Sequence, residues 1–167
     1  MAFNFLETAV KKCNVIKNGK KVCKHIDVNG VNVWNAEYVF FPNEFTTVKS
    51  NWTSSGGSWD ITSKYIYTAS KSTGSSLSLP EYTVDFSKYK DLYIEISKVN
   101  NNNNYNIRWR RKNGNSIAAR IEVDELPENE RVGVHHINIE DIDDVCYLSI
   151  DGDNGGGGYI TRIWFEE

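Results

Sequence analysis

The sequence lacks the features that define most membrane, secreted and enzyme classes. No apolar run approaches the roughly 18 residues of a membrane-spanning helix, so we expect no membrane span. The amino terminus has no basic start followed by a long apolar run, so we expect no Sec-type signal peptide. No Gly-x-Ser-x-Gly, His-Glu-x-x-His or phosphate-binding loop occurs, and we therefore do not expect an enzyme.

Positive charge and cysteine are also scarce. A net charge of -3 offers no basic footprint for nucleic acid, so we expect no nucleic-acid partner. The three cysteines form no Cys-x-x-Cys motif, which argues against a zinc site. Cys13 and Cys23 flank the Asn-Gly dipeptide at 18–19, and a two-residue turn there would place Cys13 opposite Lys24. The two cysteines would then occupy opposite faces of the hairpin, so we expect no disulfide between them.

What the sequence does contain favours β-structure. Apolar residues alternate with polar ones, as Leu92, Ile94 and Ile96 do, and this is the pattern of a half-buried strand. The pattern predicts strands over 37–41, 46–52, 58–70, 82–86, 91–99, 105–112, 116–123, 131–139, 144–150 and 159–166. No convincing amphipathic helix is present. Many short strands joined by turns predict an all-β fold, an antiparallel β-sandwich of jelly-roll type.

The first 35 residues differ from the rest. VIKNGKKV (15–22) and IDVNGVNV (26–33) each centre on Asn-Gly, the strongest short-range signal for a β-hairpin. In the second hairpin we expect Val28 to face Val31 and Ile26 to face Val33. Two small hairpins cannot stabilise themselves, so we expect residues 1–35 to be an attachment or oligomerisation segment and residues 36–167 to be the sandwich domain.

A basic strip is expected on the strands 105–112 and 116–123. A three-residue loop between them pairs Trp109 with Ala119 on the buried face. The opposite face then brings together Arg108, Arg110, Lys112 and Arg120. We weigh two interpretations of this strip: contact with an anionic polymer or partner, and an ordinary solvated sheet face, which is the commoner case.

Tryptophans are the second set of candidate binding residues. Trp52 and Trp59 flank the Ser/Gly loop 53–58 and could stack on sugar rings, although packing in the core is the commoner fate of such residues. Trp109 and Trp164 lie in alternating strands, and we expect both in the core.

A glycine-rich loop near the end of the chain leaves three interpretations open. Asp151 and Asp153 precede Gly155–Gly158 and resemble the opening of a calcium loop, but no later bidentate glutamate follows at the spacing of such loops. The favoured interpretation is a connection that turns the penultimate strand back onto the last one. The rim of a binding site is the third interpretation.

Two parts of the chain resemble proteins of phage tails. VKKCNVIKNGKKVCKHIDVNGVNVWNAEY (10–38) is similar to hairpin-forming segments of tail and fibre proteins of phages that infect Firmicutes. YTVDFSKYKDLYIEIS (82–97) and INIEDIDDVCYLSIDGDNGGGGYITRIWFEE (137–167) resemble their jelly-roll C-terminal domains, which are similar to carbohydrate-binding modules. The resemblance implies a virion-associated or prophage-encoded structural protein, found in the particle or in the host cytoplasm before assembly. It also implies other virion proteins as partners and a homotrimer.

We therefore expect a phage tail or fibre-type structural protein whose sandwich contacts a host-surface glycan. No cofactor is expected, apart from the Ca²⁺ left open above. One alternative is an architectural head or tail decoration protein without a ligand. A second alternative is a β-sandwich glycoside hydrolase built on Glu122 and Asp124. That alternative needs two carboxylates about 5 to 9 Å apart in a cleft. Glu122 and Asp124 point to one face of a strand, and the sequence places no second carboxylate opposite them.

Overall fold

The computed structural model describes residues 13–15, 21–23, 25–28, 31–35, 37–42, 53–70, 75–100, 105–152 and 155–167. The chain divides into two compact units, Val39–Phe165 and a smaller one made of Met1–Tyr38 with Glu166–Glu167. The described elements are strands, apart from three short 3-10 turns, η4, η5 and η6, at Phe86–Lys88, Val123–Glu125 and Glu128–Glu130. Within these ranges no helix has the length and apolar character needed to cross a membrane.

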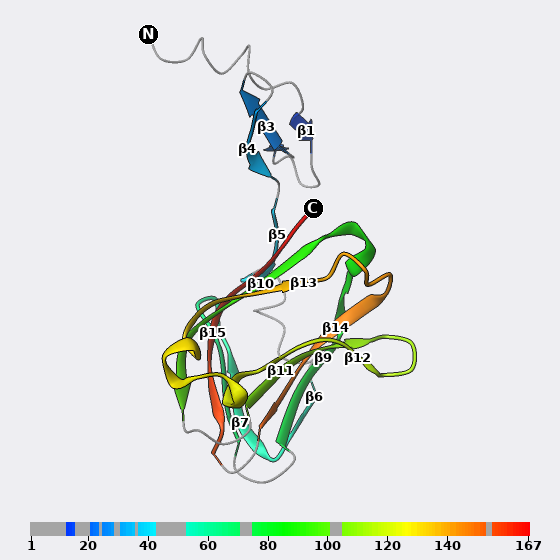
Figure 1. The fold of residues 1–167 in the computed structure, drawn as a ribbon. Helices are drawn as coiled ribbons and strands as arrows, with labels where there is room; N and C mark the ends of the chain where they lie inside the picture. The colour runs from blue at the N-terminus through cyan, green and yellow to red at the C-terminus, as the bar shows by residue number, and fades with distance from the viewer. Residues whose placement is uncertain are drawn as a thin grey trace. The chain divides into compact units, whose positions relative to one another are not determined.

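The larger unit is a sandwich of two β-sheets (Figure 1). The five-stranded sheet has the order β12-β11-β14-β9-β6, with strands Ile117–Glu122, Tyr105–Arg111, Val145–Gly152, Ser75–Asp85 and Thr53–Ser55. The six-stranded sheet has the order β13-β10-β15-β8-β7, with strands Gly133–Asn138, Asp91–Asn100, Gly157–Glu166, Ile66–Ser70 and Gly57–Ile61. Its sixth strand, β5 (Glu37–Phe41), also pairs with β15.

The connectivity is that of a jelly roll. Among the described strands from β5 onward, consecutive strands lie in different sheets at every step except two, the hairpins β7–β8 and β11–β12. Every pair whose register is defined in the described residues is antiparallel. The expected fold class, an all-β antiparallel sandwich, is therefore confirmed.

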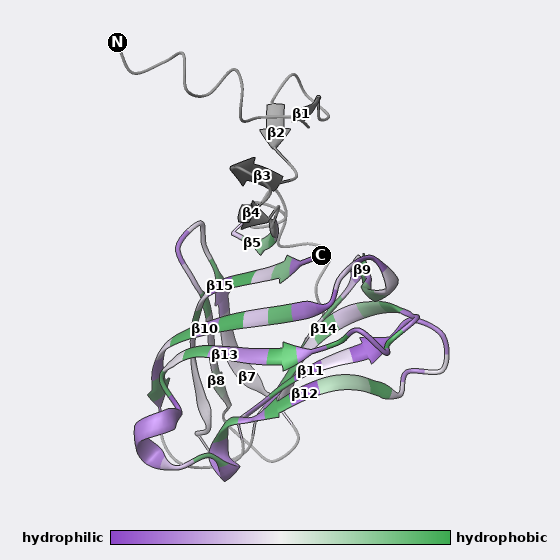
Figure 2. Ribbon diagram, turned by 45° about the horizontal axis from the view of Figure 1, so that its top comes forward, coloured by the Kyte–Doolittle hydropathy of each residue, from purple (hydrophilic) through white to green (hydrophobic). Residues whose placement is uncertain are grey.

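The core lies between the two sheets. Along β10 the side chains of Leu92, Ile94 and Ile96 are fully buried, as their alternation with polar residues predicted, and Figure 2 shows the alternating hydropathy along β10. Trp109 stands at the centre of an aromatic cluster, with its ring 5.0, 5.4 and 5.3 Å from the rings of Phe40, Phe86 and Phe165. The prediction that Trp109 belongs to the core is confirmed.

Three strand predictions differ from the structure. The expected strand 58–70 is divided into β7 and β8, because the Thr62 hydroxyl accepts hydrogen bonds from the backbone N–H groups of Lys64 and Tyr65 and closes a turn. The expected Ser/Gly loop is largely strand: β6 and β7 are separated only by Gly56, whose φ of 63° favours glycine. β9 begins at Ser75, earlier than the alternation indicated. The expected strand 46–52 lies outside the described residues.

The smaller unit contains two hairpins, β1 (Cys13–Val15) with β2 (Lys21–Cys23), and β3 (His25–Val28) with β4 (Val31–Asn35). In the second hairpin Val28 faces Val31, as expected. The expected pairing of Ile26 with Val33 is wrong, because a register shift next to Ile26 brings Trp34 opposite it.

The register predicted for the first hairpin is also wrong. Cys13 pairs with Cys23 and Val15 with Lys21, so five residues separate the strands. An odd number of intervening residues is incompatible with the symmetrical two-residue turn that we expected. A shift of one residue moves every partner to the other face of a hairpin, so the two cysteines oppose each other rather than lying on opposite faces.

Candidate functional site

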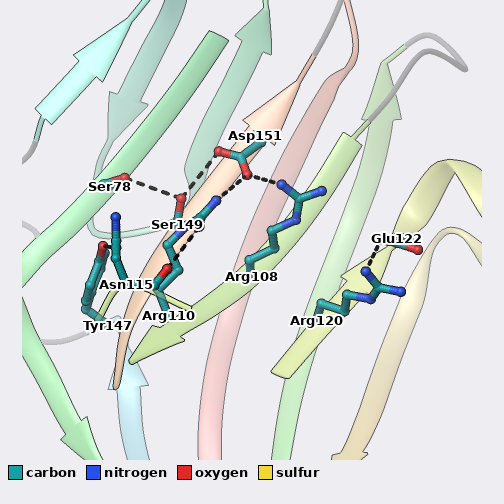
Figure 3. A network of polar contacts seen from close by, with 9 residues as sticks. All are labelled: Ser78, Arg108, Arg110, Asn115, Arg120, Glu122, Tyr147, Ser149 and Asp151. Carbon is teal, nitrogen blue, oxygen red and sulfur yellow. Dashed lines mark hydrogen bonds and ion pairs between the residues drawn. The ribbon is translucent and has the colours of Figure 1, made fainter. Parts of the chain in front are cut away.

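The outer surface of the five-stranded sheet carries the expected basic strip. The register of β11 with β12 pairs Trp109 with Ala119 and Arg108 with Arg120, as expected. Next to Trp109, however, a register shift brings Arg110 opposite Ile117, so the expected three-residue loop is wrong at the end of the hairpin. Lys112, which we expected in the strip, lies in the turn after β11. Because Trp109 faces the core, its neighbours Arg108 and Arg110 face outward. Strands β14 and β9 add hydroxyl and acidic side chains to this surface. We call it the polar face and define it by Ser78, Arg108, Arg110, Asn115, Arg120, Glu122, Tyr147, Ser149 and Asp151 (Figure 3).

One carboxylate organises the centre of the polar face. Oδ2 of Asp151 lies 2.6 Å from Nη1 of Arg108 and 3.2 Å from Nη2 of Arg110. The three side chains are only 21–23% exposed, so these contacts are better shielded from solvent than ordinary surface ion pairs. Figure 3 shows both guanidinium groups directed from β11 toward Asp151 on the neighbouring strand β14. The arginines are therefore held in fixed positions rather than extended into solvent.

Further polar contacts surround this centre. The Ser149 hydroxyl donates to the other oxygen of Asp151 at 3.4 Å, and the Ser78 hydroxyl donates to that of Ser149 at 3.3 Å. Towards one end, the Tyr147 hydroxyl donates to the side-chain oxygen of Asn115, which lies in the β11–β12 loop. The polar face thus offers donors and acceptors from β9, β14 and β11 in one continuous network.

Arg120 stands apart from the central pair. It contacts Glu122, two residues along β12, at 2.9 Å, and its side chain is 56% exposed. Figure 3 shows this pair to the side of the Asp151 network. The sequence therefore placed Arg108, Arg110 and Arg120 on one surface, but it did not indicate that Asp151 would bind two of them.

The glycine-rich loop has a different position from the one expected. It leads from β14 in the five-stranded sheet to β15 in the six-stranded sheet, so it crosses the sandwich and does not turn one strand back onto its partner. Gly157 and Gly158 belong to β15. A β-carbon on Gly157 would lie 2.1 Å from the Thr68 carbonyl oxygen, and one on Gly158 would lie 2.6 Å from that of Lys98. These glycines are required by close packing of backbone against backbone.

The two expected calcium ligands have different outcomes. Asp153 lies outside the described residues. A cation on Asp151 would have to displace two guanidinium groups from the same carboxylate. Among the described residues, no group of three or more His, Cys, Asp or Glu side chains is arranged to hold a metal ion.

The tryptophan candidates do not join the polar face. Trp52 lies outside the described residues. Trp59 is on β7, in the other sheet, where its half-buried ring packs against the core and lies over Gly57. A β-carbon on Gly57 would lie 2.7 Å from that ring. The described contacts of Trp59 are those of a packing residue.

An aromatic surface on the six-stranded sheet was not predicted. The ring of Tyr93 stacks on those of Trp164 and His136 at 5.0 and 4.8 Å, and Arg162 lies over Trp164 at 4.6 Å. Trp164 is therefore only partly buried, and its expected place in the core is wrong. The cause is a change of phase along β15: Ile160 and Ile163 are both buried, with two partly exposed residues between them. The stacked residues come from β10, β13 and β15 of the six-stranded sheet, whereas the polar face belongs to the five-stranded sheet.

The carboxylates proposed for a hydrolase, Glu122 and Asp124, lie at the end of β12 and in the turn that follows it. Glu122 contacts Arg120 and also hydrogen-bonds with Glu125, which raises the pKa of the Glu125 carboxyl. Asp124 is on the 3-10 turn η5 that follows β12.

Comparison with known proteins gives little further information. No protein-family model matches the sequence, and no curated protein matches it. Among solved structures, the chain is similar to a two-domain esterase active on acetylated mannans and co-crystallised with mannopentaose, with a TM-score of 0.39 and 9% sequence identity. The similarity covers 72% of this chain and 35% of the esterase chain, so the chain spans about a third of that protein.

Proposed function

We propose that the chain is a non-catalytic binding protein that contacts a host-surface glycan through the polar face. The observation that supports this most directly is the pair Arg108 and Arg110 held on Asp151 beside hydroxyl and amide groups. An arginine has five N–H donors, and the contact with Asp151 uses only part of that capacity. Sugars present many hydroxyl groups that donate and accept, so a face that offers both functions at fixed positions suits them.

The charge balance favours a glycan over nucleic acid. The three arginines of the polar face exceed its two acids by one charge, which is too small an excess to neutralise a row of phosphates. It is compatible with neutral sugars and with polymers that carry occasional acidic groups. The setting in a phage tail or fibre, with other virion proteins as partners and a homotrimeric assembly, belongs to the same proposal and rests on the sequence resemblance.

Binding to bacterial cell walls tests the proposal. Walls of several Firmicutes are prepared with and without acid extraction of their anionic polymers, and retention of the purified full chain is measured by sedimentation. Replacing both Arg108 and Arg110 by Gln removes two charge-assisted donors, and we expect at least a tenfold loss of affinity, which corresponds to about 1.4 kcal/mol. Lys64→Gln in the β7–β8 turn is the matched control and should bind as the unmodified chain does.

The outcomes separate the candidate functions. Equal retention of the double variant and the unmodified chain would exclude the polar face as the binding surface. Incorporation into particles without retention on any wall would favour the architectural alternative. Release of soluble sugar from the walls, abolished by Glu122→Gln, would favour the hydrolase alternative. Analytical ultracentrifugation of the full chain measures the proposed trimer directly.

A further inference from the structure

The register of the first hairpin brings two cysteines together. Cys13 is opposite Cys23, and the pairs Asn14–Val22 and Val15–Lys21 continue the same ladder. In an antiparallel pair, opposed α-carbons are about 4.5 or 5.5 Å apart, depending on whether the residues are hydrogen-bonded to each other. Both separations lie within the range of about 4.4 to 6.8 Å that a disulfide spans. The backbone therefore already has the spacing that a cross-strand disulfide needs.

We propose that this hairpin is closed by an intramolecular disulfide between Cys13 and Cys23 when the protein meets an oxidising solution. The oxidant is a small-molecule disulfide such as oxidised glutathione. One cysteine thiolate attacks it, which forms a mixed disulfide and expels one small thiolate. The second cysteine thiolate attacks the protein sulfur of the mixed disulfide and expels the other. Two protein thiols are oxidised, one small disulfide is reduced to two thiols, and the protons of the cysteines go to the departing thiolates.

The third cysteine does not compete for this bond. Cys146 is fully buried in β14, where burial and the nearby Asp144 raise the pKa of its thiol to about 11. Because the thiolate is the reactive form, a buried thiol with a raised pKa exchanges slowly. Of the three cysteines, Cys13 and Cys23 can therefore pair with each other, while Cys146 reacts slowly.

The first hairpin is short enough that a cross-link would raise its stability. Its described strands are three residues each, and an isolated two-stranded ribbon of that size is marginal in water. The neighbouring hairpin has the apolar pair Val28–Val31 next to its turn, whereas the first hairpin has Val15 opposite Lys21. A disulfide that closes the loop from 13 to 23 would restrict the unfolded ensemble instead. This inference is independent of the proposed glycan binding.

Peptide mapping tests the proposal on the full chain. The protein is equilibrated with equal concentrations of reduced and oxidised glutathione, unfolded, alkylated with N-ethylmaleimide and digested with trypsin without reduction. Cleavage after Lys12, Lys17, Lys21 and Lys24 gives the peptides CNVIK and VCK. We expect these two peptides as one disulfide-linked species, with alkylation only on the peptide that contains Cys146. If dithiothreitol is added after the glutathione step and before alkylation, all three cysteines should be alkylated.

Two variants keep the result interpretable. Cys146→Ser should retain the linked species, and Cys23→Ser should abolish it. Alkylation of all three cysteines after the glutathione treatment would overturn the proposal. A covalent dimer on a non-reducing gel, in place of the linked peptides of one chain, would also overturn it.

Discussion

Replacing Asp151 by Asn tests whether one carboxylate holds the centre of the polar face. Asn keeps the size of the side chain but removes the charge that Arg108 and Arg110 share. The two guanidinium nitrogens each contact the same oxygen, so they lie within about 6 Å of each other, where unit charges repel by roughly 3 kcal/mol at an effective dielectric of about 20. At about 0.1 M salt the Debye length is about 10 Å, so partial screening lowers this cost. We expect the variant to lose about 2 kcal/mol of stability.

Urea unfolding followed by tryptophan fluorescence measures this loss. The deficit should shrink when the salt concentration is raised, because the repulsion is electrostatic. Adding Arg110→Gln to the variant should recover at least half of the loss, since the repulsion between Arg108 and Arg110 is then removed. Asp85→Asn is the matched control: Asp85 pairs with the exposed Lys88 at 3.2 Å, and its loss should change stability little. A variant as stable as the parent at low salt, or a deficit that salt does not alter, would refute the reasoning.

Three further substitutions or treatments test the fold. Gly157→Ala places a β-carbon 2.1 Å from the Thr68 carbonyl oxygen and should lower the free energy of unfolding by about 3 kcal/mol or more, measured by thermal unfolding. Gly114→Ala has open space around it but a φ of 84°, and should lower that free energy by only about 1 kcal/mol. Trp109→Ala in the core should cost about 3–5 kcal/mol, against about 1 kcal/mol for Trp164→Ala on the outer stack. Alkylation of Cys146 at pH 9 should be far slower in folded than in urea-unfolded protein, because burial covers the thiol and the raised pKa keeps most of it protonated; equal rates would contradict its burial.

The fold class could be predicted because alternation with a period of two is a local signal. Leu92, Ile94 and Ile96 identify a half-buried strand by themselves, and the pairing of Trp109 with Ala119 could be chosen because it keeps Trp109 on the buried face. The register shift after Trp109 had no such local signal. The first hairpin lacked such a constraint. Its residues on both faces are a mixture of apolar and charged types, so the Asn-Gly signal alone decided the predicted register, and it was wrong by one residue.

The candidate site shows where local signals end. Arg108 and Arg110 could be placed on one face because they share a strand with Trp109. Asp151 belongs to β14, which is about 40 residues further along the chain and reaches β11 only after β12, β13 and two crossings between the sheets. From the local sequence, Asp151 was therefore considered as a calcium ligand. Its actual contact, with Arg108 and Arg110, depends on β14 lying beside β11. A long-range pairing of this kind decides whether the arginines are free surface charges or a fixed pair, and the proposed glycan binding depends on the second condition.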